Sequence, residues 1–368
     1  MTESPAPFAV ARRELILDEL RRTGAVRVAD LARRFKVTPL TIRRDMGYLA
    51  DRGLVTRVHG GATLRSRLDT TVPTHHPGDH LQLFRVGMVV PSLNYYWPQV
   101  ITGARAAAAE LNVQIVLRGA SYYPEDQRLQ ISSLAATGSL HGLVVAPETS
   151  GADGLALLHW LDTLDVPVVL AERRLPSTLA LTRLNSVTTN HVFGGALAGR
   201  HLADLGHQVV GIVTSTGSPT SGHLRRGWVR ALDDHGLSCH IDLDIERSDL
   251  EGPRRQEIVT GILSRCRETG TTALLVHSDP EAVVIQQTAL DQGWNVPGDL
   301  SIIAYDDEVA ENAEPAITAL RPPKHEVGQL AIEMMVRRLR TGAAMSAQRT
   351  YLLPTLHRRA STGSVTSA

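Results

Sequence analysis

The stretch VADLARRFKVTPLTIRRDMGYLADRGLVTRVHGGA, residues 28–62, decides the fold of the first part of this 368-residue chain. Val28, Leu31 and Phe35 recur at the spacing that places apolar residues on one face of a helix. Working outward, residues 9–22 show the same kind of spacing. The sequence therefore predicts two amphipathic helices in close succession before residue 38.

A third helix is expected to begin at Thr38-Pro39. A threonine N-cap accepts a backbone N–H, and a proline at the first helical position loses no hydrogen bond. Ile42, Met46 and Leu49 form the apolar stripe of this helix and are predicted to face inward. The outer face then carries Thr41, Arg44 and Tyr48, with Arg43 on its flank.

A β-hairpin is predicted after the third helix. Apolar and polar residues alternate over 54–58, as in a strand. His59-Gly60-Gly61 is a turn, and residues 62–64 form the second strand. Such a hairpin is a wing, and Arg57 and His59 would touch a nucleic-acid backbone or minor groove from it. Arginine pairs with guanine edges or phosphate and threonine with either, so the third helix suits a major groove.

The charge of the chain is unevenly distributed. Residues 1–68 hold 14 Arg and Lys against 7 Asp and Glu, whereas the remainder holds 24 against 31. A basic first part on an acidic second part is expected when only the first part approaches a polyanion. The alternatives are a basic face that is merely solvated and a winged helix used only for protein contacts.

The whole run 28–62 closely resembles the winged helix of DeoR-type regulators, most specifically in TIRRD (41–45) and RVHGGA (57–62). Met46-Gly47 and Ala50 depart from that family, which more often has Leu and Glu there. The resemblance implies binding to double-stranded operator DNA. The predicted DNA-binding residues are Thr38, Thr41, Arg43, Arg44, Tyr48, Arg57 and His59.

The rest of the chain alternates short apolar strands with helices, which predicts an α/β architecture with parallel sheets. Strands are expected near 86–90, 113–117, 142–146, 167–170, 209–213, 273–277 and 300–304, and helices near 98–110, 124–136, 152–164, 192–205, 222–235, 253–267, 280–292 and 325–340. Eight helices are many for one sheet, so two consecutive lobes with a cleft between them are predicted. The expected domains are 1–64, a linker 65–83, a two-lobed domain 84–358 and a flexible tail 359–368.

Three segments of the two-lobed part resemble the effector-binding domain of LacI/GalR-type regulators, which is similar to periplasmic sugar-binding proteins. They are RVGMVVPSLNYYWPQVITGARAAAAELN (85–112), AGRHLADLGHQVVGIV (198–213) and TTALLVHSDPEAVVIQQTALDQGWNVPGDLSIIAYDDE (271–308). Their order is that of the family over nearly all of 85–356. The resemblance implies a transcription regulator, a repressor, whose DNA binding is controlled by a small polar effector such as a sugar.

The same resemblance implies which side chains hold the effector. They are Asn94, Tyr96 and Trp97 in the loop after the first strand, Glu148 and Glu172 at the ends of their own strands, and Asp279, whose carboxylate can accept two vicinal hydroxyl groups. Three alternatives stay open: Trp97 is a core residue, Ser278 or Asp279 caps a helix, and Glu172-Arg173 is an interlobe salt bridge.

Two positions depart from the family pattern. Leu224 stands where the family often has an arginine before its Gly-aromatic pair, here Gly227-Trp228, and Arg225 or Arg226 would take over that role. Leu250 stands where a stacking aromatic residue is common. We therefore expect Arg225 at the effector and an effector different from the best-known ones of the family.

Composition and motifs exclude other classes of protein. None of the motifs GxSxG, GxxxxGK[ST], HExxH or CxxC occurs, so neither enzymatic activity nor a cofactor is expected. His75-His76 lack further ligands nearby, and Cys239 and Cys266 lack metal-site spacing, so no metal is expected and a reducing cytoplasm fits. No apolar run is long enough for a membrane span, and the first ten residues do not form an export signal.

The expected partners are operator DNA, a sugar-like effector and a second copy of the chain. The alanines at 106–109 would permit close approach of a symmetry mate, or equally burial within their own lobe. Two other functions are alternatives. One is a DeoR-like regulator with an isomerase-related domain that senses a phosphorylated sugar, and the other is a sugar-binding protein that does not bind DNA. The first fits the motifs of 85–356 worse, and the second would need an export signal and no DNA-binding domain.

Overall fold

A computed structural model of the chain describes residues 9–23, 25–51, 55–58, 61–64, 83–176, 179–246, 250, 252–342 and 346–365. The chain separates into two compact units, Met1–Gln82 and Leu83–Ala368. We call the first unit the head and the second unit the body. The division falls next to the start of the two-lobed domain expected at residue 84.

The head combines three helices with a three-stranded antiparallel sheet. The helices are α1 (Ala9–Thr23), α2 (Val28–Arg34) and α3 (Pro39–Asp51), and the strands are β1 (Ala25–Arg27), β2 (Val55–Val58) and β3 (Gly61–Leu64), in the order β1-β3-β2. The predicted helices and hairpin are confirmed. Strand β1 was not predicted, because three residues are too few to show alternation.

The inward face of α3 holds the head together. Ile42, Met46 and Leu49 are buried, as predicted, and α3 packs against both α1 and α2. Burying each of these side chains stabilises the fold by about 1.5–3 kcal/mol. The outer face of α3 is thereby fixed.

The first lobe of the body is a parallel sheet between two layers of helices. Its strands are β4 (Phe84–Val90), β5 (Val113–Gly119), β6 (Gly142–Val145), β7 (Val168–Ala171), β8 (Asn185–Thr189) and β14 (Arg349–Leu352), in the order β14-β8-β7-β6-β4-β5. Helices α4 (Trp97–Glu110) and α12 (Lys324–Thr341) cover one face, and α5 (Pro124–Ala135) and α6 (Gly151–Asp162) cover the other. Two apolar clusters, one on each face, form the core of this lobe.

The second lobe repeats this plan. Its strands are β9 (Val209–Ser215), β10 (Ser238–Ile245), β11 (Ala273–His277), β12 (Ser301–Tyr305), β13 (Thr318–Arg321) and β15 (Thr355–His357), in the order β10-β9-β11-β12-β13-β15 with only β15 antiparallel. Helices α7 (His191–Asp204) and α8 (Ser221–His235) cover one face, and α10 (Arg255–Thr269) and α11 (Asp279–Asp291) cover the other, with a short 3-10 helix η1 (Ala310–Asn312) nearby. All eight body helices expected from the sequence are present.

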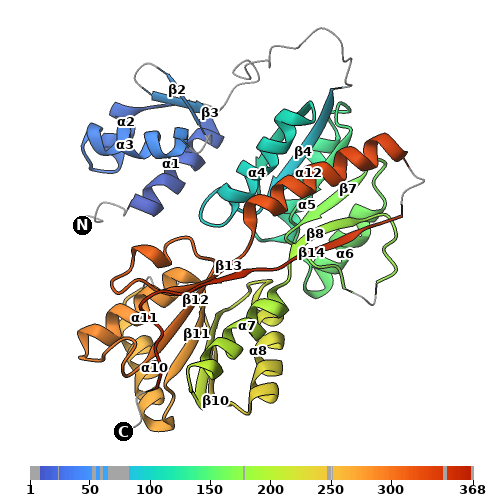
Figure 1. The fold of residues 1–368 in the computed structure, drawn as a ribbon. Helices are drawn as coiled ribbons and strands as arrows, with labels where there is room; N and C mark the ends of the chain where they lie inside the picture. The colour runs from blue at the N-terminus through green and yellow to red at the C-terminus, as the bar shows by residue number, and fades with distance from the viewer. Residues whose placement is uncertain are drawn as a thin grey trace. The chain divides into compact units, whose positions relative to one another are not determined.

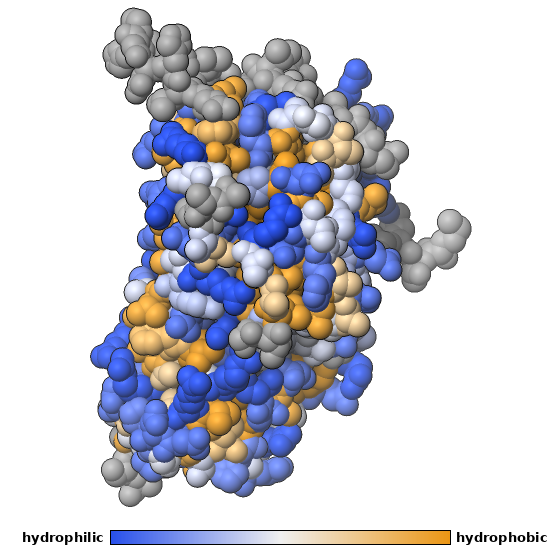
Figure 2. Space-filling view, turned by 90° about the vertical axis from the view of Figure 1, so that its right-hand side faces the viewer, coloured by the Kyte–Doolittle hydropathy of each residue, from blue (hydrophilic) through white to orange (hydrophobic). Residues whose placement is uncertain are grey.

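The lobes are not strictly consecutive in sequence, which corrects one expectation. The chain crosses between them three times, from β8 to α7, from β13 to α12 and from β14 to β15, so α12 and β14 return to the first lobe (Figure 1). On the face drawn in Figure 2, hydrophilic and apolar residues are interspersed, as on an ordinary protein surface. The alanine-rich segment of α4 buries Ala107 and Ala108 in the core of its own lobe, while Ala106 and Ala109 stay exposed.

Helices α7 and α8 approach each other closely because glycines lie at their contact. A Cβ on Gly227 would lie 1.8 Å from the carbonyl oxygen of Val192, and one on Gly195 would lie 2.1 Å from that of Leu224. Only glycine permits this approach. It brings the first turns of both helices to the same end of the second lobe.

Gly227→Ala is expected to destabilise the body by about 1–3 kcal/mol, because the added methyl group must push two helix backbones apart. Gly261→Ala on α10 is the matched control: no atom lies within 4 Å of its Cβ position, so it should be neutral or stabilise by up to about 1 kcal/mol. Urea unfolding followed by tryptophan fluorescence measures both. Equal shifts for the two variants would contradict the close helix contact.

The C-terminal segment is packed, not flexible, over its described part. Ser361 is fully buried, its carbonyl accepts the N–H of Ile302 at 2.9 Å, and its hydroxyl donates to the Ile302 carbonyl at 2.6 Å. Arg359 lies 2.8 Å from the carboxylate of Asp307. The flexible tail predicted from residue 359 is therefore wrong for residues 359–365.

Deleting residues 359–368 is expected to destabilise the body strongly. The deletion leaves the buried N–H and carbonyl groups of Ile302 without their partners, at roughly 1–3 kcal/mol each. Deleting only 366–368 should leave the midpoint of urea unfolding unchanged. If the longer deletion unfolded at the same urea concentration as the shorter one, the packed segment would not contribute to stability.

Candidate functional site

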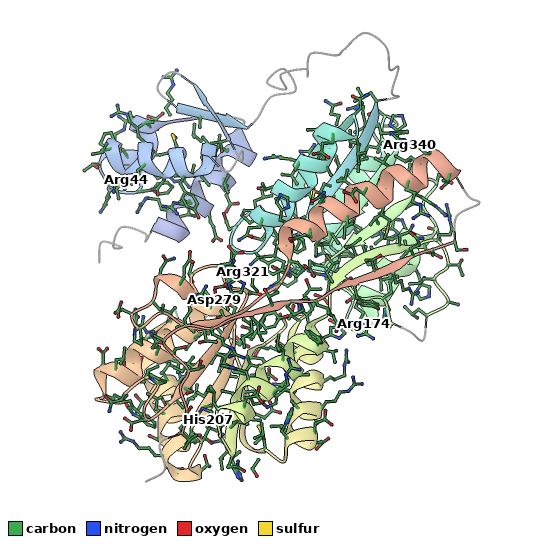
Figure 3. All side chains as sticks on the ribbon, in the orientation of Figure 1. Arg44, Arg174, His207, Asp279, Arg321 and Arg340 are labelled. Atoms are coloured by element: carbon green, nitrogen blue, oxygen red, sulfur yellow. The ribbon has the colours of Figure 1, made fainter. Side chains whose placement is uncertain are left out.

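The outer face of α3 presents the side chains expected to contact DNA. The hydroxyl of Thr38 accepts the N–H of Thr41 at 3.2 Å and so caps the helix, and the two hydroxyls lie 2.9 Å apart. Arg43 and Arg44 are exposed, and Figure 3 shows Arg44 on the surface of the head. The first turns of α3 therefore offer two hydroxyl groups and two guanidinium groups to a partner.

A buried ion pair fixes this helix on α1, which the sequence did not reveal. Asp45 is 2% exposed and accepts hydrogen bonds from Arg12 Nε at 2.6 Å and Arg13 Nε at 2.9 Å. The guanidinium of Arg13 also lies 3.7 Å from the ring centre of Tyr48. Asp45 and Arg13 thus set the orientation of α3 and the position of Tyr48.

The wing is described only in part. Arg57 lies on β2, which pairs with β3 as the hairpin prediction requires, and its side chain lies outside the described part of the chain. His59 lies outside the described residues. The contacts predicted for both remain predictions.

The body has a polar cavity of about 20 Å³ between its lobes. It lies at the carboxyl ends of β7 and β8 and beside the first turns of α7 and α8, and Figure 3 shows Arg174 between the lobes. The charged and titratable residues that line it are Glu172, Arg173, Arg174, His191, His223 and Tyr351. This volume holds about one water molecule, so a sugar-sized ligand requires the lobes to separate.

Glu172, one of the predicted effector residues, is the centre of a hydrogen-bonded cluster beside this cavity. Its carboxylate accepts the hydroxyl of Tyr96 at 2.7 Å and the N–H and hydroxyl of Thr189 at 3.0 and 2.7 Å, and it lies 3.7 Å from His191. Burial alone would raise the pKa of Glu172, but His191 and Thr189 outweigh it and the pKa is lowered. Burial, and next the charge of Glu172, raise the pKa of Tyr96 well above its usual value.

The remaining first-lobe predictions lie outside the lining of this cavity. Trp97 is buried in the core of its lobe as the first residue of α4, in line with the core alternative. The N–H of Asn94 bonds to the hydroxyl of Ser92 within the loop after β4. Glu148 accepts two backbone N–H groups and the hydroxyl of Ser150, at the start of α6. These three side chains do not line the cavity described above.

Asp279 is not placed as a ligand carboxylate. It is fully buried, and its two oxygens accept the N–H groups of residues 307–310 at 2.6 to 3.2 Å. Burial raises the pKa of Asp279, and these N–H bonds oppose the rise. Ser278 is the N-cap of α11 and forms a capping box with Glu281. Asp279 therefore holds the loop after β12, and Figure 3 shows it where the second lobe meets the first.

Arg225 is also engaged elsewhere. It forms ion pairs with Asp242 and Asp244 at 2.7 and 3.0 Å on the edge strand β10. Arg226 bonds to the imidazole of His223, and neither arginine lines the cavity. His223 is the residue of α8 that reaches it.

Between the lobes, the backbone is held in unfavourable conformations. Tyr95, Glu172, Asp306 and Asp307 have positive φ although none is glycine. Such conformations cost of order 1–3 kcal/mol each and cluster at functional sites. Lys324, fully buried, bonds to the carbonyl of Asp306 at this junction. Lys324 also forms an ion pair with Glu308 at 2.6 Å. The sequence motifs gave no sign of this lysine, because only the fold brings these partners to it.

The sequence matches two families, one in each unit. Residues 12–67 match the DeoR-like helix-turn-helix domain, and residues 200–362 match the periplasmic binding protein-like domain. The chain thus combines a DeoR-like helix-turn-helix head with a periplasmic binding protein-like body. The isomerase-related body weighed as an alternative is excluded by this match.

Two curated relatives of this chain carry the names of bacterial repressors. The chain is 24% identical over 314 residues to the arabinose metabolism transcriptional repressor of Geobacillus stearothermophilus, which covers 84% of this chain and 83% of that protein. It is 33% identical over 165 residues to the ribose operon repressor of Haemophilus influenzae, covering 43% and 48%. A solved LacI family transcriptional regulator from Enterococcus faecium with bound ribose superposes with a TM-score of 0.62 at 21% identity, over 77% of this chain and 100% of that one. The body shares the two-lobed fold of that regulator.

Among the described residues, no helix is long and apolar enough to cross a membrane. No group of three or more His, Cys, Asp or Glu side chains among them could hold a metal ion.

Proposed function

We propose that this chain is a DNA-binding transcription regulator, a repressor, whose operator binding is controlled by a small polar effector in the interlobe cleft. The proposal rests on one observation: a head and a body with different structural features are joined in one polypeptide. The head exposes Arg43 and Arg44 on a rigidly held helix, and the body encloses a polar cavity between two lobes. The relatives support the proposal, since their names describe repressors of arabinose and ribose genes.

The proposed mechanism couples the two parts through the arrangement of the lobes. Two copies of the chain would hold two heads on the half-sites of one operator. An effector that contacts both lobes binds one lobe arrangement more tightly than the other, and it can change DNA affinity only by that difference. The N-terminal turns of α7 and α8 and the loop after β7 are the parts that meet at the effector.

A selection from random duplex DNA tests the proposal without knowledge of the operator. Full-length protein should enrich a pair of related half-sites with two-fold symmetry, whereas residues 83–368 should enrich none. The enriched duplex then serves as the probe for effectors. Failure of the full-length chain to enrich any sequence above the truncated chain would overturn the proposed function.

A further inference from the structure

Arg173 carries a buried hydrogen-bond donor without an acceptor at the cavity wall. The residue is 5% exposed; its Nε donates to the carbonyl of Pro147 at 2.7 Å and its Nη1 to the carbonyl of Glu172 at 2.9 Å. Its guanidinium lies 5.5 Å from the ring centre of Trp97, and its Nη2 is buried and has no hydrogen-bond acceptor in the described part of the chain. A buried charged donor left in this state is costly, so an acceptor from outside the chain is favoured at this point.

Further positive charge surrounds the same cavity. Arg174 lines it with an exposed side chain, and its guanidinium lies 5.4 Å from the ring centre of Tyr351. The pKa of His223 is lowered to about 4 by burial and then by the charges of Arg226, His191 and Arg174. His223 is therefore neutral near pH 7, first because it is buried and then because of the positive charges around it.

A helix start adds to this potential. The side chain of Asn190 accepts the N–H of Phe193 and caps α7, whereas the N-cap residue of α8, Thr220, makes no such bond. Thr220 lines the cavity, and α8 continues for 15 residues. The N–H groups of Ser221, His223 and Leu224 already bond to carbonyl groups of the preceding turn, so the contribution of α8 is the dipole of a helix this long, which favours an anion near its start.

One carboxylate offsets part of this charge: Glu172 lines the cavity, but the two arginines Arg173 and Arg174 outnumber it. Glu172 accepts three hydrogen bonds from Tyr96 and Thr189, and Glu148 accepts three from its own loop. Both acids are engaged by donors of the chain itself. Arg173 and Arg174 form no ion pair with either of them, so the sequence alternative of a Glu172–Arg173 salt bridge is not what the structure contains.

We propose that the effector is a small hydroxylated anion, a sugar carboxylate or a sugar phosphate, whose anionic group binds to Arg173, Arg174 and the start of α8. This inference rests on the proposed function, because it names the chemistry of the effector in the same cleft. The arginines belong to the first lobe and α8 to the second. An anion bound to both lobes favours the lobe arrangement that places these groups around it.

A matched ligand series tests the inference on the full-length protein. Three sets share the same four- to six-carbon skeletons: neutral sugars, the corresponding sugar acids and the corresponding sugar phosphates, with inorganic phosphate as the simplest probe. In thermal shift followed by calorimetric titration, at least one charged set should bind about tenfold or more tightly than its neutral parents. The charged set that binds identifies the source of the anion. Binding confined to neutral sugars, or no stabilisation by any anion tested, would overturn the inference.

Variants locate the anion in the cleft. Arg174→Ala should weaken binding of the charged ligand by about tenfold and leave any binding of its neutral parent unchanged. Arg173→Lys keeps the charge but cannot make both carbonyl bonds and reach the anion, so it should weaken the same ligand. Arg340→Ala, which removes an exposed arginine from the far end of α12, is the control (Figure 3). Equal affinities for Arg174→Ala and Arg340→Ala would place the anion elsewhere.

The DNA experiment separates the failure of this inference from the failure of the proposed function. If the protein selects a duplex but responds only to neutral sugars, the regulator stands and the anion is wrong. If an anion binds through Arg174 but the full-length chain selects no duplex, the site stands and the proposed function is wrong.

Discussion

Replacing Arg43 and Arg44 together with alanine is expected to weaken binding to the selected duplex at least about a hundredfold at physiological salt. Both side chains are exposed on the outer face of α3, and neither belongs to the buried ion pair that fixes the helix. Each arginine that contacts a phosphate contributes about 0.9 to the slope of log affinity against log salt, and each contact to a base edge is worth about 1–3 kcal/mol. The slope should therefore fall by up to roughly 1.8.

Salt titrations of the two proteins by fluorescence anisotropy measure both quantities. Arg265→Ala is the matched control, since it removes an exposed arginine from α10 of the body. The control should leave affinity and slope as they are. A double variant that keeps the full slope would show that the outer face of α3 does not touch the DNA backbone.

Asp45→Ala should unfold the head while the body stays folded. The substitution removes the carboxylate that Arg12 and Arg13 share. Their side chains, which are 9% and 19% exposed, then lie beside an apolar core without a partner for their charge. Removing one partner of a buried ion pair costs about 3–5 kcal/mol. Few small domains can lose that much and remain folded, so DNA binding should be lost with the head.

The positions of the tryptophans make this result easy to recognise. All four, Trp97, Trp160, Trp228 and Trp294, belong to the body, so their fluorescence follows the body alone, whereas circular dichroism follows both units. Asp45→Ala should lose the circular-dichroism transition of the head and keep the fluorescence transition of the body. Asp30→Ala is the control, because its pair with Arg33 is exposed (58% and 81%) and worth at most about 1 kcal/mol. A normal head transition in Asp45→Ala would contradict the role assigned to Asp45.

The sequence predicts the regular elements well where apolar periodicity marks them. It misses five strands of the body: β8, β10, β13, β14 and β15. The clearest case is β8, Asn185–Thr189, which is fully buried although four of its five residues are polar. Partners outside the strand bond to two of them: the side-chain oxygen of Asn185 accepts the N–H of Gln348, and the hydroxyl of Thr188 donates to the carbonyl of Arg173. Such bonds join segments far apart in the chain, so no local pattern announces the strand.

The site is predicted less well for a related reason. Resemblance placed Asp279 at a ligand position, but a buried carboxylate can equally hold a loop, and only the fold shows that its acceptors are taken by residues 307–310. Conversely, the sequence suggests only one role for Arg173, an ion pair with the adjacent Glu172. Its unpartnered Nη2 depends on where the carbonyl of Pro147 lies, which the sequence does not disclose.

The three chain crossings in the body have a consequence for its synthesis. The head ends by residue 82 and can fold while the ribosome is still producing the body. The first lobe cannot close its core until α12 and β14 emerge, and the second awaits β15 and Ser361. A premature stop codon anywhere between the head and residue 361 would therefore release a folded head attached to an incomplete body. Such a product would keep the DNA-binding unit but could not respond to an effector.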